Sequence, residues 1–385
     1  MSVWDELTGQ SEAIAIFRAA AADSSLRDAP IGDSAMTHSW LITGPPGSGR
    51  SNLAYAFATA LLSPPDPEGE EATRRQVAAR THPDLGVLST EGVIIKMADV
   101  QKFVTTSYFS PSVSRYRVMV IEDADRMVER TSNVLLKALE EPPPRTVWIL
   151  CAPSEADLLP TIRSRVRSVR LRVPDVAEVA ELISRRDGVD LATATRAARE
   201  SQSHIGMAHR LATNEEARRR RQLTLDIALG IHSVSDAVVA ASKLLALAGE
   251  DAKAITEERD AEEREGALRS LGIEPGGTIP PALRAQLRTL EEDQKRRATR
   301  SLRDGIDRIM VDLQSLYRDI LLLQLGVPSE PINLAIHSQL VSAAEATTAA
   351  ATLGTMDAIA TARKRIDGNV SPALALEAML ISAAR

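Results

Sequence analysis

One short segment restricts the possible folds of this chain more than any other. Residues 41–62, "LITGPPGSGRSNLAYAFATALL", run from an apolar stretch through a Gly/Pro loop into a helical pattern. A strand, a loop and a helix in this order make a phosphate-binding loop, because glycines let backbone N–H groups wrap phosphate oxygens at a helix N-terminus. Gly44, Gly47 and Gly49 supply those glycines. The segment therefore predicts a phosphate loop on an α/β sheet, and the alternative is a plain turn that binds nothing.

The loop departs from the usual pattern at the position that matters most for hydrolysis. Arg50 stands where such loops carry lysine, and Ser51 follows with a hydroxyl of the kind that ligates Mg²⁺. Arginine can pair with phosphate, but its planar fork is bulkier than an ammonium group and cannot act as the same point charge. We expect ATP or ADP with Mg²⁺ at most as a static or weakly bound ligand, and inefficient hydrolysis.

A second nucleotide motif is also altered. The apolar run Val118–Ile121 ends in Glu122 and Asp123, whereas the usual order is an aspartate for Mg²⁺ and then a glutamate that orients the attacking water. The exchange displaces both carboxylates, and displacements of about 1 Å are costly in catalysis. The alternative is that the two acids cap the helix that follows. Both departures weaken the same activity.

The order of apolar and helical segments predicts three domains. Short apolar runs such as Val147–Cys151 alternate with helical stretches, as is typical of buried parallel strands in an α/β sheet. We expect residues 1–172 to form an α/β phosphate-loop domain, 173–213 a small helical lid domain, and 214–385 an all-helical domain. In the last domain, apolar residues recur at three- and four-residue spacing, which predicts a helix that packs on other helices. These residues are Leu302, Ile306, Ile309, Leu313, Leu316 and Ile320.

Several polar segments are expected at the surface. The Pro- and Gly-containing residues 63–72 are interpreted as a loop. Residues at about 250–300 are highly charged, with the interruption "PGGTIPP" at 275–281, and we expect a mobile or solvent-facing insertion there. The basic clusters Arg218–Arg221 and Lys295–Arg297 are interpreted as solvated helix faces, with contact to DNA as the alternative.

Composition excludes several classes of protein. Cys151 is the only cysteine, so neither an intrachain disulfide nor a cysteine-rich metal site can form. The formal net charge of −6 argues against a protein that coats nucleic acid by bulk electrostatics. No apolar run reaches the roughly 18 residues that span a bilayer, and the acidic N-terminal segment is unlike a signal peptide. We expect a cytoplasmic protein.

A longer motif is much more specific than either nucleotide motif. Residues 132–166, "SNVLLKALEEPPPRTVWILCAPSEADLLPTIRSRV", resemble the clamp-loader branch of the AAA+ ATPases, in which N-x-L-L-K-x-L-E-E-P-P precedes the fourth strand and S-R-C follows it. The matching positions are Asn133, Leu135, Leu136, Lys137, Leu139, Glu140, Glu141, Pro142, Pro143, Leu159, Pro160, Thr161, Ile162, Ser164 and Arg165. Val166 replaces the cysteine of S-R-C. The resemblance implies an AAA+ phosphate-loop domain, a helical lid and an all-helical C-terminal collar that mediates oligomerisation.

Within that family, three further segments are most similar to the delta-prime branch from bacterial DNA polymerase III. They are "VWDELTGQ" near the N-terminus, "THPD" at Thr81–Asp84, and "IEDADRM". The resemblance implies assembly with gamma/tau and delta subunits and action on a sliding clamp and primed DNA. It also implies that Arg165 is offered to the ATP on a neighbouring gamma/tau subunit. An arginine supplied in trans stabilises charge on the transferring phosphoryl group.

Other positions depart from the ATPases of the family in the same direction. Ala152 and Pro153 stand where a threonine senses the γ-phosphate, and they offer no side-chain donor. In "HIGMAHRLA", the sensing position of a G-x-x-R segment falls on His209, and Arg210 one residue further on is the candidate nucleotide contact. The cysteines of the family's zinc module are missing, so no zinc is expected, and His82 alone is interpreted as a structural or capping residue.

The residues leave three functions open. The favoured one is a subunit of the DNA polymerase III holoenzyme that lacks ATPase activity of its own and completes a neighbour's site through Arg165. The first alternative is an active gamma/tau-type ATPase, in which Arg50 would replace lysine and Asp123 the catalytic glutamate. The second is a stand-alone DNA-remodelling AAA+ protein, which would need a basic or aromatic pore loop that is not visible in the sequence.

Overall fold

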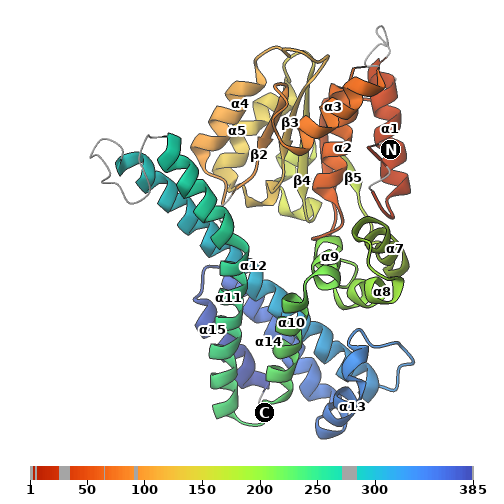
Figure 1. The fold of residues 1–385 in the computed structure, drawn as a ribbon, viewed down its shortest axis with the longest axis vertical. Coiled ribbons are helices and arrows are strands. Elements are labelled where there is room, and N and C mark those ends of the chain that lie inside the picture. The colour runs from red at the N-terminus through yellow and green to blue at the C-terminus, as the bar shows by residue number, and fades with distance from the viewer. Residues whose placement is uncertain are drawn as a thin grey trace. The chain divides into compact units, whose positions relative to one another are not determined.

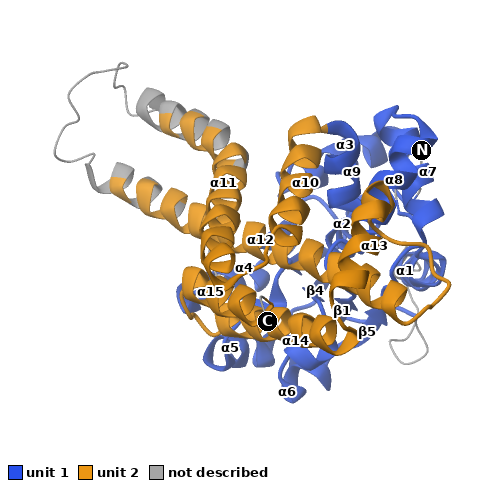
Figure 2. Ribbon diagram, turned by 90° about the horizontal axis from the view of Figure 1, so that it is seen from below, with its two compact units in different colours: residues 1–213 blue, residues 214–385 orange. Residues whose placement is uncertain are grey.

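The chain folds into two compact units. The computed structural model describes residues 3–4, 7–25, 35–64, 66–90, 94–270 and 284–383. Figure 2 shows the two units, residues 1–213 and residues 214–385, in different colours. No helix in these described ranges is long and apolar enough to cross a membrane.

Unit 1 is an α/β layer followed by three short helices (Figure 1). Its strands are β1 (Ser39–Thr43), β2 (Leu85–Leu88), β3 (Arg117–Ile121), β4 (Thr146–Ala152) and β5 (Arg167–Arg170). The helices of the layer are α1 (Ser11–Ser25), α2 (Arg50–Leu62), α3 (Pro67–Ala78), α4 (Met97–Ser107), α5 (Glu129–Glu140) and α6 (Pro160–Arg163), with the 3-10 turns η1 (Ala124–Arg126) and η2 (Glu155–Asp157). The lid helices that follow are α7 (Val176–Asp187), α8 (Leu191–Glu200) and α9 (Ile205–Thr213).

The five strands form one parallel sheet in the order β2-β3-β4-β1-β5. The predicted α/β sheet is confirmed, including the strands at the apolar runs 118–121 and 147–151. The sequence does not predict β2 and β5, because each has four residues and β5 keeps three of its four side chains exposed. Strands of only four residues carry too little periodicity to be recognised.

Alternate side chains of the sheet enter two separate cores, one on each face. Trp40 of β1 packs with Phe17 of α1 and Phe57 of α2, with ring centroids 4.8 Å and 5.6 Å away. On the other face, Trp148 of β4 packs with Phe103 of α4, with ring centroids 5.8 Å apart. Because helices cover both faces, the central strands read as continuous apolar runs rather than as alternating patterns.

The segment 63–72 is not a loop throughout, contrary to expectation. Helix α3 begins at Pro67, and the Asp66 side chain caps it by accepting a hydrogen bond from the Gly69 N–H at 2.7 Å. Proline at the first helical position and acidic residues in the first turn both favour a helix start. The Pro and Gly residues of this segment therefore mark a helix N-terminus.

Unit 2 is helical throughout its described residues apart from its connections. Its elements are α10 (Glu215–Leu229), α11 (Val234–Ser270), α12 (Arg284–Gln324), η4 (Leu334–Ile336), α13 (His337–Ala346), α14 (Ala349–Asp367) and α15 (Pro372–Ala383). The predicted apolar stripe lies on α12 and packs against residues of α10, α11, α14 and α15 within this chain. Its fully buried members are Ile306, Ile309, Leu313, Leu316 and Ile320. The predicted helical C-terminal region is confirmed.

The charged segment at about 250–300 continues the helices α11 and α12 in its described residues. These helices run side by side in Figures 1 and 2, and an ion pair of 2.6 Å joins Arg297 Nη1 to Asp260 Oδ1. Arg297 is buried, so the interpretation of Lys295–Arg297 as a solvated face is wrong for this residue. The interruption at 275–281 lies outside the described residues.

A buried polar network holds the segment after α12 against that helix. Asp319, which is 1% exposed, accepts hydrogen bonds from the N–H groups of Ile332 at 3.0 Å and Asn333 at 2.8 Å, and from Asn333 Nδ2 at 2.9 Å. Arg221 donates to Asn333 Oδ1 at 2.5 Å and to Asp312 Oδ1 at 3.1 Å. Arg221 is buried, so its interpretation as part of a solvated face is also wrong.

The network predicts a local loss of stability. Asp319→Ala should destabilise unit 2 by about 3 kcal/mol, because it leaves buried N–H groups without an acceptor. The three tryptophans lie in unit 1, so their fluorescence reports that unit, whereas far-UV circular dichroism reports both units. We expect part of the dichroism signal to be lost at lower urea concentration while the fluorescence transition stays in place.

The matched control is Asp357→Ala, which removes an exposed carboxylate from α14. Its effect should stay within about 0.5 kcal/mol, as for most surface substitutions. Equal shifts in the two variants would contradict the role given to the Asp319 network.

Candidate functional site

The phosphate loop has a glycine-dependent backbone at the start of a helix. Gly47 and Gly49 have left-handed φ angles of 78° and 91°, which other residues rarely adopt, and α2 begins at Arg50. Ser48 Oγ is buried and has no hydrogen-bond partner among the described residues. Ser51 is the second residue of α2 and is half-buried. The backbone of the loop thus has the form that suits an anion.

The guanidinium group of Arg50 folds back onto this loop. Its Nη1 donates a short hydrogen bond to the carbonyl oxygen of Gly44. Gly44 in turn donates its N–H to the carbonyl oxygen of Pro153 at 3.2 Å, which joins the loop to the end of β4. The positive charge that would meet a phosphate is therefore engaged by the backbone of its own loop.

A histidine at the start of the last lid helix lies against the tip of the loop. A Cβ atom at Gly47 would lie 2.3 Å from His204 Cγ, so the imidazole ring packs directly on the Gly47 backbone. Ile205 donates its N–H to the Gly47 carbonyl oxygen at 3.3 Å. Helix α9 therefore begins on the phosphate loop and covers Gly47.

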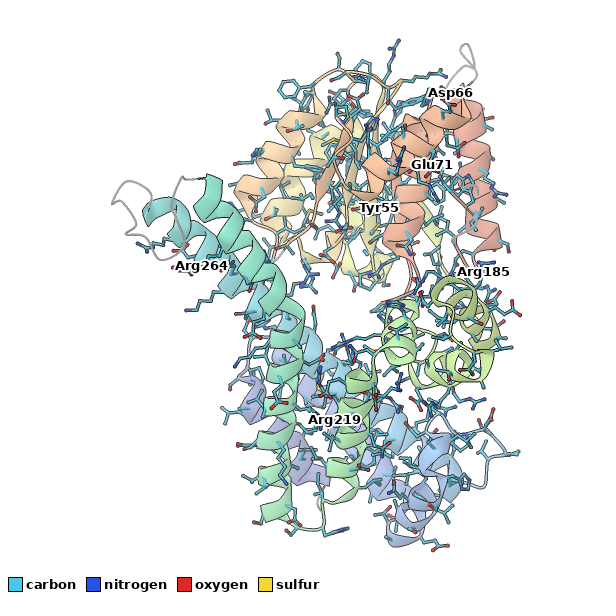
Figure 3. The ribbon with its side chains drawn as sticks, in the orientation of Figure 1. Tyr55, Asp66, Glu71, Arg185, Arg219 and Arg264 are labelled. Atoms are coloured by element: carbon cyan, nitrogen blue, oxygen red, sulfur yellow. The ribbon has the colours of Figure 1, made fainter. Side chains whose placement is uncertain are left out.

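The acid that follows β3 is held by side chains from two neighbouring segments. Tyr55 of α2, labelled in Figure 3, donates its hydroxyl to Glu122 Oε1 at 2.6 Å. Arg80, which follows α3, donates to the same oxygen at 3.0 Å, and its guanidinium lies 5.7 Å from the Tyr55 ring centroid. Burial, and then the hydrogen bond to Glu122, raise the pKa of the Tyr55 phenol. Arg80 thus balances the charge of Glu122 within this chain.

Asp123 belongs to the same group of charges at the carboxyl ends of the strands. Its Oδ1 lies 4.0 Å from Arg126 Nε. Burial raises the pKa of the Cys151 thiol to about 12; the nearby Arg50 charge opposes this, and the Glu122 and Asp123 charges reinforce it. The structure therefore brings together Arg50, Glu122 and Asp123, as the two altered motifs predict from their place after parallel strands.

The charged side chains around the phosphate loop have partners within this chain. Arg50 is bonded to Gly44, Glu122 is paired with Arg80, and Gly47 is covered by His204. Within the described ranges, no group of three or more His, Cys, Asp or Glu side chains could hold a metal ion. The loop retains the backbone of an anion site, but the side chains around it already contact other groups of unit 1.

Arg165, the predicted arginine finger, lies at the surface between α6 and β5. Its Nε donates to Glu140 Oε1 at 2.6 Å, and its Nη1 donates to the Thr161 carbonyl oxygen at 2.6 Å. The Arg165 side chain is 32% exposed and that of Glu140 is 45% exposed. In the described part of the chain, no hydrogen bond or ion pair joins Arg165 to loop residues 44–51. The structure thus separates this arginine from the phosphate loop.

Two histidines that the sequence singles out have partners inside unit 1. His209 Nδ1 lies 2.7 Å from Asp187 Oδ2 at the end of α7, so this side chain is engaged within the lid. His82 is buried, and its Nδ1 accepts a hydrogen bond from the Asp84 N–H at 3.1 Å. Arg210 is half-buried on α9, and its contact with nucleotide stays a prediction.

Comparisons with known proteins point to one family. The family model described as "DNA polymerase III, delta subunit" matches residues 25–175. The delta-prime subunit of DNA polymerase III from Pseudomonas aeruginosa is 33% identical over 154 residues, which cover 38% of this chain and 47% of that protein. This part of the chain is similar to delta-prime subunits of DNA polymerase III. The DNA polymerase III gamma/tau subunit of Mycobacterium tuberculosis is 26% identical over 159 residues, which cover 39% of this chain and 27% of that protein.

This chain spans about half the length of the Pseudomonas relative that it matches. Among solved structures, a gamma subunit-related protein from Thermotoga maritima is 17% identical with a TM-score of 0.40, covering 90% of this chain and 93% of that one. A RuvB variant from the same organism is 20% identical with a TM-score of 0.41, covering 59% and 66%. The predicted parallel α/β sheet domain followed by helices is confirmed.

The sequence motifs do not reveal the residues that contact Glu122, Gly47 and Arg165. Tyr55 and Arg80 lie 67 and 42 residues from Glu122 in the sequence. His204 is the first residue of the segment that predicts Arg210, but nothing in that segment indicates its contact with Gly47. Glu140 belongs to a recognised motif, but its pairing with Arg165 is visible only in three dimensions. A basic residue just before "THPD" is the one signal that could have suggested a partner for Glu122.

The contact between His204 and Gly47 predicts a difference between two glycine substitutions. Gly47→Ala adds left-handed strain and a clash with His204, whereas Gly49→Ala adds strain alone, because nothing lies within 4 Å of a Cβ atom there. We expect Gly49→Ala to destabilise unit 1 by about 1 kcal/mol and Gly47→Ala by about 2–3 kcal/mol. Urea unfolding followed by tryptophan fluorescence measures both changes.

A second-site substitution tests the cause of that difference. In a cycle with His204→Ala, most of the extra destabilisation of Gly47→Ala should disappear, while the effect of Gly49→Ala should be unchanged. If His204→Ala leaves the Gly47→Ala effect as it was, the packing of α9 on the phosphate loop is refuted.

Proposed function

We propose that this chain is the delta-prime-type subunit of a bacterial clamp loader, with little or no ATPase activity of its own. It assembles with gamma/tau and delta subunits and donates Arg165 to the ATP bound by a neighbouring gamma/tau-type subunit. In the cytoplasm it supports the loading of a sliding clamp onto primed DNA during replication. The observation that carries the proposal is the contrast between Arg50, which is bonded to its own loop, and Arg165, which lies at the surface with an exposed carboxylate as a partner.

The engaged phosphate loop supports the absence of hydrolysis in this chain. A nucleotide that bound productively would have to displace Arg50 from the Gly44 carbonyl oxygen and His204 from Gly47. Mg²⁺ would have to compete with Arg80 for Glu122. Each of these contacts stabilises the present form of the loop. In this proposal the loop therefore has a structural role and not a catalytic one.

The surroundings of Arg165 support a role on a partner. The Arg165 N–H is hydrogen-bonded to the Ile162 carbonyl oxygen at 2.9 Å, and β5 is paired with the central strand β1 just beyond it. A guanidinium is always charged, and its planar fork matches phosphate oxygens. When a neighbour's γ-phosphate approaches this surface, the arginine would meet the charge that develops in the transition state.

The first test concerns turnover in the assembled complex. Arg165→Ala should reduce hydrolysis at the neighbouring site by about 10³-fold, the usual scale for loss of an arginine finger. The measurement is clamp- and primer-template-stimulated ATP turnover by a complex reconstituted from this chain, gamma/tau and delta subunits, under single-turnover conditions.

The control for this experiment is Arg163→Ala. Arg163 is exposed two residues away on α6, so the substitution removes the same charge from the same surface. We expect unchanged turnover and unchanged assembly by size-exclusion chromatography. A similar loss in both variants would assign the effect to surface charge and would refute the specific role of Arg165.

A second test concerns this chain alone. We expect no ATP turnover above background, and Arg50→Lys should not create any, because Glu122 stays paired with Arg80. Turnover by the isolated wild-type chain that Arg50→Ala abolishes would instead identify an active gamma/tau-type ATPase.

A further inference from the structure

The guanidinium group of Arg165 is almost completely engaged by residues of its own chain. Nε and Nη2 both contact Glu140 Oε1, the former at 2.6 Å. Nη1 donates to the Thr161 carbonyl oxygen at 2.6 Å and to Ser164 Oγ at 3.2 Å. An arginine recognises phosphate best through two parallel N–H groups on one edge. Both such edges of Arg165 are occupied by groups of its own chain. We call this arrangement stowed, because the guanidinium would have to give up contacts before it could bind a phosphate on either edge.

The partners of Arg165 differ in how easily they can be exchanged. The Thr161 oxygen belongs to the backbone of α6 and cannot move without that helix. Glu140 is the last residue of α5, is 45% exposed, and contacts Arg165 only through a flexible side chain. A partly exposed ion pair of this kind has a small net free energy, because water solvates both charges when they separate. Glu140 is therefore the contact that a stronger anion would replace.

We propose that Glu140 is a latch for the arginine finger: it holds Arg165 stowed until the γ-phosphate of the neighbour's ATP displaces it. This inference rests on the proposed role of Arg165. A terminal γ-phosphate carries more negative charge than a carboxylate and offers several acceptor oxygens, so it competes well for the Nε and Nη2 edge. ADP lacks that group. Bound ADP would therefore leave Arg165 paired with Glu140.

The latch predicts a change in apparent affinity rather than in the chemical step. Glu140→Gln removes the carboxylate charge. Arg165 then no longer has to break an ion pair before it contacts the nucleotide. The KM for ATP of the reconstituted complex should fall by about two- to five-fold, which corresponds to the strength of a partly exposed ion pair. Inhibition by ADP should stay unchanged, because ADP has no γ-phosphate to displace Glu140. The kcat should stay within about twofold, because the finger itself is intact.

A readout in the isolated chain examines the latch without the partners. In protein labelled with ¹⁵N-arginine, the Nε–H signal of Arg165, assigned through Arg165→Lys, should exchange with water slowly in the wild type. In Glu140→Gln the exchange should be about two- to five-fold faster, because the carboxylate acceptor is gone. Glu141→Gln is the matched control, since Glu141 is the adjacent exposed acid, and it should change neither the exchange rate nor the KM. Glu140→Ala provides a second variant with the same expected direction.

The outcomes separate this inference from the proposed function. If Arg165→Ala leaves turnover of the complex unchanged, both the role of Arg165 as an arginine finger and the latch are refuted. If Arg165→Ala removes turnover while Glu140→Gln and Glu140→Ala leave KM and Nε–H exchange unchanged, the role of Arg165 stands and the latch is refuted. If the Glu140 variants lower kcat without lowering KM, Glu140 supports the active position of Arg165, which also overturns the latch.

Discussion

The parallel pairing of β1 with β4 decides what surrounds the phosphate loop. It sets Thr43 opposite Ala152, so that Gly44 leaves β1 beside Pro153 and donates its N–H to that residue's carbonyl oxygen. The pairing of β3 with β4 then places Glu122 at the same edge of the sheet. Since the carboxyl ends of parallel strands share one edge, three segments far apart in the sequence contribute to one environment. The helices on both faces hold this register by burying the alternate side chains of every central strand.

Two arginines in unit 1 illustrate how the same chemical group serves different purposes. The guanidinium group of Arg50 donates a hydrogen bond to the Gly44 carbonyl oxygen of its own loop. Arg165 lies at the surface, where it contacts the exposed Glu140 carboxylate and the Thr161 carbonyl oxygen. A contact with a backbone oxygen cannot be given up unless the backbone moves, whereas a contact with an exposed side chain can be exchanged at little cost. In the proposed function, the contact with Glu140 is the one that lets Arg165 exchange partners, and Arg50 has no contact of this kind among the described interactions.

Internal counterions explain the clearest differences between the sequence-based expectations and the structure. The sequence predicts that Arg221 and Arg297 are solvated, because they lie in basic clusters, yet both are buried. Their acidic partners lie 91 and 37 residues away in the chain. A buried charge requires a paired and hydrogen-bonded partner, and such a partner is recognised only when two helices meet. Arg80, which neutralises Glu122 across 42 residues, is a third case of the same kind.

The sequence by itself determined the features that depend on neighbouring residues. Glycine spacing sets the shape of the phosphate loop, apolar runs set the central strands, three- and four-residue spacing sets the buried stripe of α12, and one dense motif identifies Arg165 as an exposed functional candidate. Only the tertiary structure decided which side chains engage one another: Arg50 with Gly44, His204 with Gly47, and Glu140 with Arg165. The physical reason is range. Periodicity and turn chemistry act over a few residues, whereas a hydrogen bond or an ion pair depends on distance in space, which the packing of the sheet and helices sets.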